Sequence, residues 1–136
     1  MLNSMFTTPK VALYIKQTAT LHLLNFKFLY MALIKSVNGL TPRWGKDCYC
    51  SENATIVGEV IMGDECSIWF NAVVRGDVAH VHIGNRVNVQ DGACVHVTRK
   101  IGPTHIEDDV SIGHNATVHA CTIRKGALIG MGATVL

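Results

Sequence analysis

Apolar residues recur every six positions along most of this chain. The period begins at Trp44 and runs unbroken to Val74, and it restarts in a new phase at Ile83, Ile106 and Ile123. A period of six fits neither the 3.6 residues of a helical turn nor the two of a plain strand. We call the apolar residues that begin these hexads lead residues: Trp44, Cys50, Ile56, Met62, Ile68, Val74, Ile83, Val89, Val95, Ile106, Ile112, Val118, Ile123, Ile129 and Val135.

A small residue follows most lead residues by four positions. Such a pattern is typical of a parallel β-helix, in which each hexad forms a short strand and a bend and three hexads form one triangular coil. We therefore predict an all-β fold, a hexapeptide-repeat β-helix of about five coils, with strands of successive coils about 4.8 Å apart. The expected interior small residues are Cys48, Ala54, Val60, Cys66, Ala72, Val78, Val87, Ala93, Val110, Ala116, Thr122, Ala127 and Ala133.

The phase assigns every hexad to one of three faces. Trp44 begins the first face, Cys50 the second and Ile56 the third. Extra residues fall near 79–82 and 99–105, both after a third face, so both should project from the same corner. The repeat stops at Leu136 on a third face without the polar cap that solenoid ends normally need. We therefore expect that C-terminal coils or a helix are missing.

Residues 1–30 show no six-residue period and contain three Lys but no Asp or Glu. Lys16 and Gln17 interrupt the apolar run that a secretory signal needs, and the absence of Arg disfavours a mitochondrial presequence. We interpret them as an extension upstream of a domain at residues 31–136, with Met31 as the true start. Residues 31–43 should form a short strand and a turn at Asn38-Gly39.

Composition narrows the function classes. The net charge of +2 does not indicate binding to nucleic acid or a membrane surface, and no apolar run is long enough to span a bilayer. The five cysteines include no CxxC pair, which favours small buried thiols in a reducing compartment. We expect a cytoplasmic protein.

Three histidines occupy informative positions of the repeat. His96 and His119 directly follow third-face lead residues, so their side chains should point outward from adjacent coils, one strand spacing apart. His114 lies on the second face and should be too far around a bend to join them within one subunit. A neighbouring subunit could supply it, and three such interfaces would close a homotrimer. His22, His80, His82 and His105 lack ligand spacing, and we interpret them as solvated surface residues.

Three neutral imidazoles leave a coordination position open, as catalytic zinc requires. Zinc would lower the pKa of its bound water to near 7, giving hydroxide that attacks a small electrophile. Arg75 and Asp77 lie one coil before His96, where they could orient the water, hold an anionic product, or form a structural ion pair. Gln90 and Asp91 lie on the second face, one coil before His114.

Three stretches of the chain resemble motifs of the gamma-class carbonic anhydrase family. They are Arg75-Gly76-Asp77, Asn88-Val89-Gln90-Asp91-Gly92 with His96, and His114-Asn115-Ala116-Thr117-Val118-His119. The resemblance covers about residues 31–136. It implies a left-handed β-helix and a homotrimer. It also implies zinc (or iron or cobalt) bound by His96 and His119 of one subunit and by His114 of the next. It also implies hydration of CO2, an Arg75–Asp77 pair across the interface, and Gln90 and Asp91 near the water.

Two departures separate the chain from the archetypal members. They have Glu where this chain has Val78, and an acidic loop with a proposed proton shuttle where it has the short segment 97–103. The chain is closer to shorter bacterial relatives, and the resemblance supplies no proton route. Two alternatives to CO2 hydration stay open: an acyl-CoA-dependent transferase or thioesterase, and a non-catalytic trimeric scaffold with a structural metal.

Overall fold

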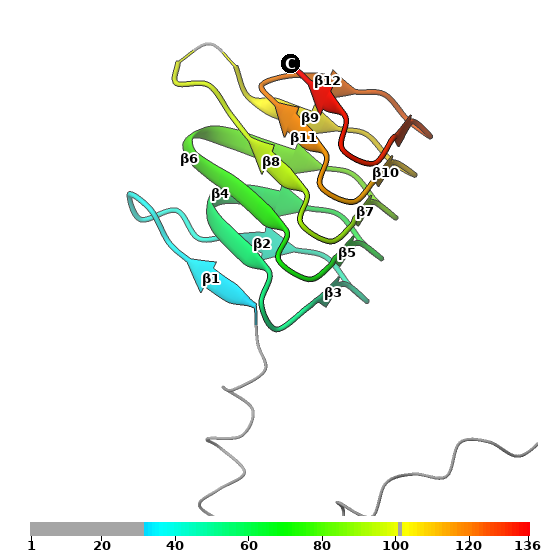
Figure 1. The fold of residues 1–136 in the computed structure, drawn as a ribbon. Coiled ribbons are helices and arrows are strands. Elements are labelled where there is room, and N and C mark those ends of the chain that lie inside the picture. Colours follow the sequence, from blue (N-terminus) through cyan, green and yellow to red (C-terminus); the bar gives the residue numbers. More distant parts are fainter. Residues whose placement is uncertain (1–31, 101) are drawn as a thin grey trace, which may run out of the picture.

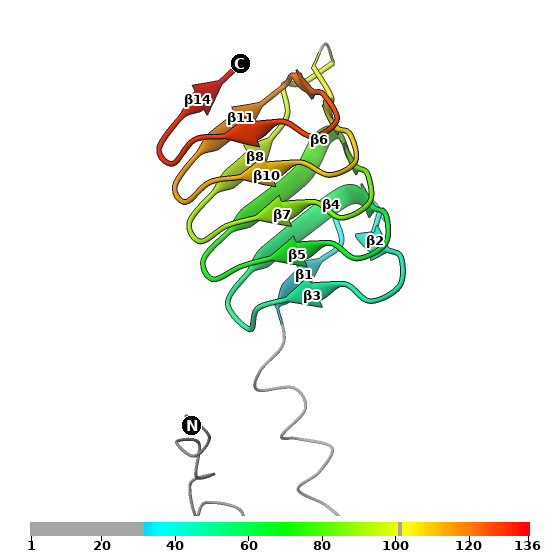
Figure 2. The ribbon, with the colours of Figure 1, turned by 90° about the vertical axis from the view of Figure 1, so that its right-hand side faces the viewer.

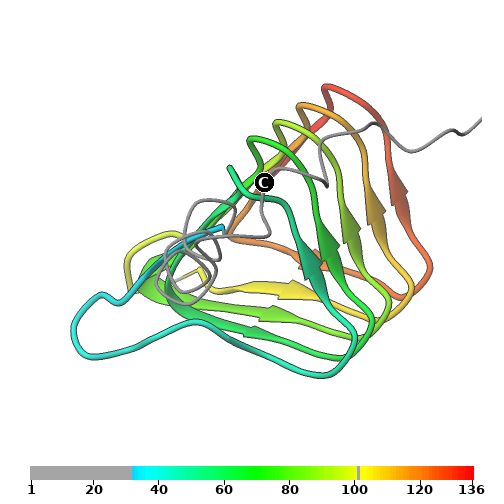
Figure 3. The ribbon, with the colours of Figure 1, turned by 90° about the horizontal axis from the view of Figure 1, so that it is seen from below.

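The computed structural model describes residues 32–100 and 102–136. They form a parallel β-helix whose coils stack along one axis (Figure 1). Seen along that axis, the coils are triangular and wind in the left-handed sense (Figure 3). The expectation for residues 1–30 lies outside the described residues. Among the residues described, no helix could cross a bilayer.

Each face of the β-helix is one column of short strands. The second face is a five-stranded sheet of β3 (Tyr49–Cys50), β5 (Ser67–Ile68), β7 (Asn88–Val89), β10 (Ser111–Ile112) and β13 (Leu128–Ile129). The third face contains β1 (Leu33–Lys35), β8 (Cys94–His96), β11 (Thr117–His119) and β14 (Thr134–Val135). The first face contains β2 (Arg43–Trp44), β9 (Thr104–Ile106) and β12 (Thr122–Ile123). Two long strands, β4 (Thr55–Met62) and β6 (Val73–Ile83), run from the third face onto the first (Figure 2).

The register of the strands confirms the predicted phase on every face. On the first face Met62 pairs with Ile83, and Ile83 with Ile106. On the second face Ile68 pairs with Val89. The large lead residues therefore stack directly above one another, as a six-residue period with three faces requires.

The interior of the prism is filled by these lead residues and by small residues at the corners. Ile56, Ile68, Val89, Ile112 and Val118 are fully buried. Ala54, Ala72, Ala93 and Ala116 are buried beside the second-to-third corner, where only a small side chain fits between neighbouring strands. Trp44 and the last coil are more exposed because, within residues 32–100 and 102–136, a coil covers them on one side only.

Two predicted interior residues lie outside instead. Val78 is 41% exposed and Thr122 is also exposed. The chain takes three extra residues after Asp77, so that Val60 pairs with Val81 and not with Val78. Val81 and Thr104 fill that interior column, and Cys121 continues it because Thr122 pairs with His105. The prediction of Val78 and Thr122 was wrong because the hexad was counted through the irregular corner.

The two insertions project from the corner between the third and first faces, as predicted, and a turn of residues 37–40 lies at the same corner. Val37 and Leu40 close a two-residue turn in which Asn38 and Gly39 both have positive φ, 52° and 77°. Thr98 and Gly102 close a second hairpin. Residues of both hairpins and of the segment after Gly76 line one shared pocket, so the three loops lie together.

Candidate metal centre

His96 and His119 lie side by side on the third face because β8 and β11 pair in register. Nδ1 of His96 faces Nε2 of His119 at 3.1 Å. Two nitrogens bound to one tetrahedral ion at about 2.0 Å each are about 3.3 Å apart. The two rings are thus already placed at the spacing of ligands that share a metal, as the repeat predicted.

Asp77 binds the outer side of His96. Its Oδ1 lies 3.0 Å from Nε2 of His96, and its Oδ2 pairs with the guanidinium of Arg75 at 2.5 Å. Burial alone would raise the pKa of Asp77, but hydrogen bonds from His96 and Arg75 outweigh it and hold that pKa below its ordinary value. A carboxylate at this nitrogen fixes the proton there and leaves Nδ1 of His96 with its lone pair.

Thr98 is a member of the site that sequence reasoning missed. Its hydroxyl oxygen lies 3.5 Å from Nδ1 of His119. Thr98 is two residues after His96, so strand alternation places both side chains on the outer surface. That period-two signal was readable in the sequence, but residues 97–103 were considered only as a shortened loop.

His114 lies on a different face from the other two histidines. It follows β10 of the second-face sheet, and its Nδ1 is 3.0 Å from Oδ2 of Asp91. Gln90 follows β7 on the same face and is half-buried. The structure therefore brings together Arg75, Asp77, His96 and His119 in one group and Asp91 and His114 in another.

No group of three or more His, Cys, Asp or Glu side chains among the described residues is arranged as a complete metal site. The separation of His114 from His96 and His119 agrees with that finding for a single subunit. Each group has one histidine held by a carboxylate, which is the usual second partner of a metal-bound imidazole. The ligand types fit zinc, but only if a second chain completes the set.

A pocket of about 290 Å³ lies at the loop corner behind Asp77. Its lining includes Glu59, Val78 and Arg99. Val78 occupies the position where the archetypal family members have Glu. Glu59 is the other carboxylate of this pocket besides Asp77, and it reaches the corner from the coil below.

The five cysteines are all free thiols. Burial raises the pKa of Cys50 to about 11 and also raises the pKa values of Cys66 and Cys121. Such thiols remain protonated near neutral pH and are poor metal ligands. The expectation of small buried cysteines holds for Cys66 alone, because the other four are only partly buried.

No protein-family model matches the chain, but individual relatives do. The chain is 45% identical over 104 residues to a carbonic anhydrase of Geobacillus kaustophilus, covering 76% of this chain and 57% of that protein. It is 41% identical over 101 residues to the mitochondrial gamma carbonic anhydrase 2 of Arabidopsis thaliana, covering 71% of this chain and 36% of that protein. The chain thus spans roughly one third to three fifths of the length of these two relatives.

Solved structures agree on the fold. A Bacillus cereus protein, for which an acetyltransferase activity has been suggested, superposes with a TM-score of 0.69 at 35% identity, covering 77% of this chain and 71% of that one. A hexapeptide transferase family protein from Anaplasma phagocytophilum superposes with a TM-score of 0.62 at 28% identity, covering 75% and 74%. From the sequence motifs, the β-helix and these relatives we conclude that the chain belongs to the gamma-class carbonic anhydrase-like family of hexapeptide-repeat proteins.

Proposed function

We propose that this protein catalyses the reversible hydration of CO2 to bicarbonate, at a zinc site shared between the subunits of a homotrimer. The observation that carries the proposal is the in-register pair of His96 and His119, whose facing nitrogens are 3.1 Å apart. Iron or cobalt would suit the same ligands. The names of the two carbonic anhydrase relatives support this reaction class.

The third ligand in this proposal is His114 of a neighbouring subunit. His114 is exposed and lies on the second face, so it cannot complete the coordination around His96 and His119 of its own chain. Asp91 would hold Nδ1 of His114 in the same way that Asp77 holds Nε2 of His96. Both histidines would then present their remaining nitrogen as a lone pair.

Exposed apolar side chains on the second face favour burial of that face in an oligomer. Tyr49, Trp69, Leu128 and Met131 all lie on or beside its strands, and Leu128 and Met131 are each 77% exposed. Tyr49 and Trp69 pack against each other with ring centroids 5.3 Å apart. Exposed aromatic side chains such as Tyr49 and Trp69 are enriched at contacts between protein chains.

Zinc held by three imidazoles would acidify a bound water so that hydroxide is available near neutral pH. Asp77 keeps the ring of His96 in the orientation in which its Nδ1 is free to bind. The hydroxyl oxygen of Thr98 would accept a hydrogen bond from the Nδ1–H of His119 once Nε2 of that ring is used as a ligand. Arg75 is 43% exposed beside the site and can pair with an anionic product.

Proton release needs a group at the edge of the site, because Val78 carries no ionisable side chain. Glu59 lines the same pocket as Asp77 and is half-buried. In this proposal Glu59 has the role of the Glu that the archetypal family members have at the position of Val78. Gln90, half-buried beside Asp91, would donate or accept a hydrogen bond near the bound water.

The test is a stopped-flow measurement of CO2 hydration on full-length protein of known zinc content, together with the His114→Ala variant. We expect activity in the zinc-loaded wild type and loss of both activity and shared zinc in the variant. A variant that keeps its full zinc content, or a zinc-replete wild type without hydration activity, would contradict the proposal.

Acyl transfer is the second candidate, because two of the solved structures similar to this chain are described as transferases. An acyltransferase would use a single histidine as general base and would need no metal. Turnover of acetyl-CoA that survives chelation of zinc would favour this reaction. Loss of the trimer on chelation, with no activity in zinc-loaded protein, would favour a structural role for the metal.

A further inference from the structure

Three histidines outside the proposed zinc site gather on the first face of one chain. The ring centroids are 5.4 Å apart for His80 and His82, 5.1 Å for His80 and His105, and 5.8 Å for His82 and His105. Their rings are inclined to one another by 60° to 78°, so they are not stacked. His80 and His105 are half-buried and His82 is exposed.

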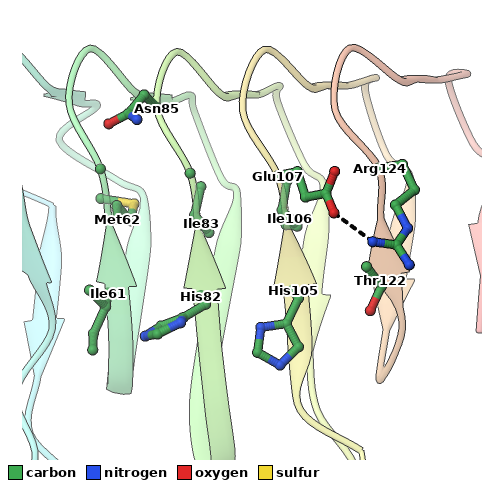
Figure 4. Close-up of a pocket in the computed structure, with 12 residues that line it drawn as sticks. Ile61, Met62, His82, Ile83, Asn85, His105, Ile106, Glu107, Thr122 and Arg124 are labelled. Atoms are coloured by element: carbon green, nitrogen blue, oxygen red, sulfur yellow. Dashed lines mark hydrogen bonds and ion pairs between the residues drawn. The ribbon is translucent and has the colours of Figure 1, made fainter.

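The backbone holds these rings together. Val81 points into the core and is fully buried, so strand alternation turns His80 and His82 outward on the same side of β6. His82 pairs in register with His105 of β9. Figure 4 shows the rings of His82 and His105 side by side on neighbouring strands, between Ile61 and Thr122 of the coils on either side.

The spacing of the three rings matches that of a shared metal ion. A metal about 2.0 Å from an imidazole nitrogen lies about 3.2 Å from the ring centroid, so two rings on a tetrahedral ion have centroids about 5.2 Å apart. The three measured separations bracket this value. The His96–His119 pair of the proposed zinc site has a centroid separation of 5.0 Å.

We infer that His80, His82 and His105 form a second metal site, contained within a single subunit, for a divalent transition metal of the zinc type. Neutral imidazole ligands select zinc, copper or nickel over magnesium and calcium, which prefer oxygen. The site is independent of the trimer, because all three ligands come from two adjacent strands of one chain.

Binding requires the rings to turn, because no three-ligand group among the described side chains is already arranged around a metal. His82 is exposed and has room to do so. A groove of about 620 Å³ runs beside His82 and His105 and would leave a coordination position open to solvent.

The test is metal titration of full-length protein, stripped of metal, with wild type, His82→Asn and His114→Ala. We expect about two zinc ions per chain in the wild type and about one in each variant, because each substitution removes one ligand of a three-imidazole set. The zinc affinity of the second site should fall about a hundredfold or more in His82→Asn, since even an indirect partner of a ligand contributes 10–100-fold. Cobalt should bind with the absorption spectrum of a four-coordinate ion, and magnesium should not compete.

The variants separate this inference from the proposed function. If the wild type binds one zinc that only His114→Ala removes, the second site does not exist and the shared site stands. If it binds one zinc that only His82→Asn removes, the second site stands and the shared site fails. An unchanged circular dichroism spectrum and melting temperature in metal-free His82→Asn establish that the loss of metal is local. A matching His105→Asn variant must show the same loss of metal.

Discussion

At the scale of single residues, the orientation of the proposed ligands depends on carboxylates. Asp77 contacts both His96 and Arg75, so one side chain links a proposed metal ligand to a proposed anion-binding group. Asp91 makes the corresponding contact with His114. A carboxylate that accepts from an imidazole fixes both the tautomer and the ring plane, which a metal site needs before the metal arrives.

Replacing Asp77 with Asn should weaken zinc binding at the shared site by about 10- to 100-fold, because the amide holds His96 less firmly in the required tautomer. Competition for zinc against a chromophoric chelator measures this change. The control is Asp109→Asn, which removes a carboxylate that pairs with Arg86 on another corner. Equal zinc affinity in wild type and Asp77→Asn would refute the orienting role of Asp77.

The partly buried Cys50 gives a second prediction at this scale. The pKa of Cys50 is raised from 9.0 to about 11, first by burial and then by Cys48 and Cys66. At pH 8 its thiolate fraction is then roughly a hundredfold lower than that of an ordinary cysteine. Iodoacetamide labelling followed by peptide mass spectrometry should show Cys50 modified about a hundredfold more slowly in native than in unfolded protein. Comparable rates in the two states would show that the native structure does not shield the Cys50 thiol.

At the scale of elements, paired glycines lie where β4 and β6 pass from the third face to the first. Gly58 has φ of 77° and pairs with Gly76. A Cβ on Gly58 would lie 2.3 Å from the carbonyl oxygen of Gly76, which immediately precedes Asp77. These glycines therefore allow two strands to pass closely at the corner that carries Asp77.

Gly58→Ala should destabilise the protein by roughly 2–4 kcal/mol, because the methyl group clashes with backbone and the positive φ is strained. Chemical denaturation measures this free energy of unfolding. Gly130→Ala is the matched control: a Cβ there meets nothing within 4 Å, so its cost should stay within about 0.5 kcal/mol. Equal stability of the two variants would mean that the close approach of Gly58 and Gly76 does not exist.

At the scale of the whole molecule, the second and third faces each carry part of the proposed shared site. The second face also carries the exposed aromatic pair of Tyr49 and Trp69, whereas the third face carries His96 and His119. Assembly, metal binding and activity should therefore be lost together when the second face is altered.

Trp69→Glu should convert the proposed trimer to monomer and remove the shared zinc, because a charge replaces an aromatic side chain at the proposed contact. Light scattering coupled to size exclusion measures the mass, and zinc analysis of the same fractions measures the metal. Lys125→Glu changes an exposed charge at another corner and should leave both unchanged. A Trp69→Glu trimer with full zinc content would place the subunit contact elsewhere.

The sequence was sufficient to predict the regular parts of the molecule and insufficient for the irregular ones. The positions of residues such as Ile68 and Val89 could be predicted because the strands of one face follow each other at the same spacing. The positions of Val78 and Thr122 could not, because three residues are inserted after Asp77 and the step from Val118 to Ile123 is one residue short. Neither change of phase has an apolar signal. The His80, His82 and His105 group was missed for the same reason: the register between β6 and β9 is set across an insertion of three residues and a hairpin.

The lengths of the three corners have a consequence for how this protein can change. Successive lead residues are six apart at two corners of every coil, for example from Met62 to Ile68 and from Ile68 to Val74. At the third corner the distance varies, from five between Val118 and Ile123 to eleven between Val95 and Ile106. Insertions are thus tolerated at the one edge that also holds Asp77 and Thr98. New side chains can be gained or lost beside the proposed reaction centre while the stacked core stays in register, so the chemistry of the site can diverge among relatives faster than their shape.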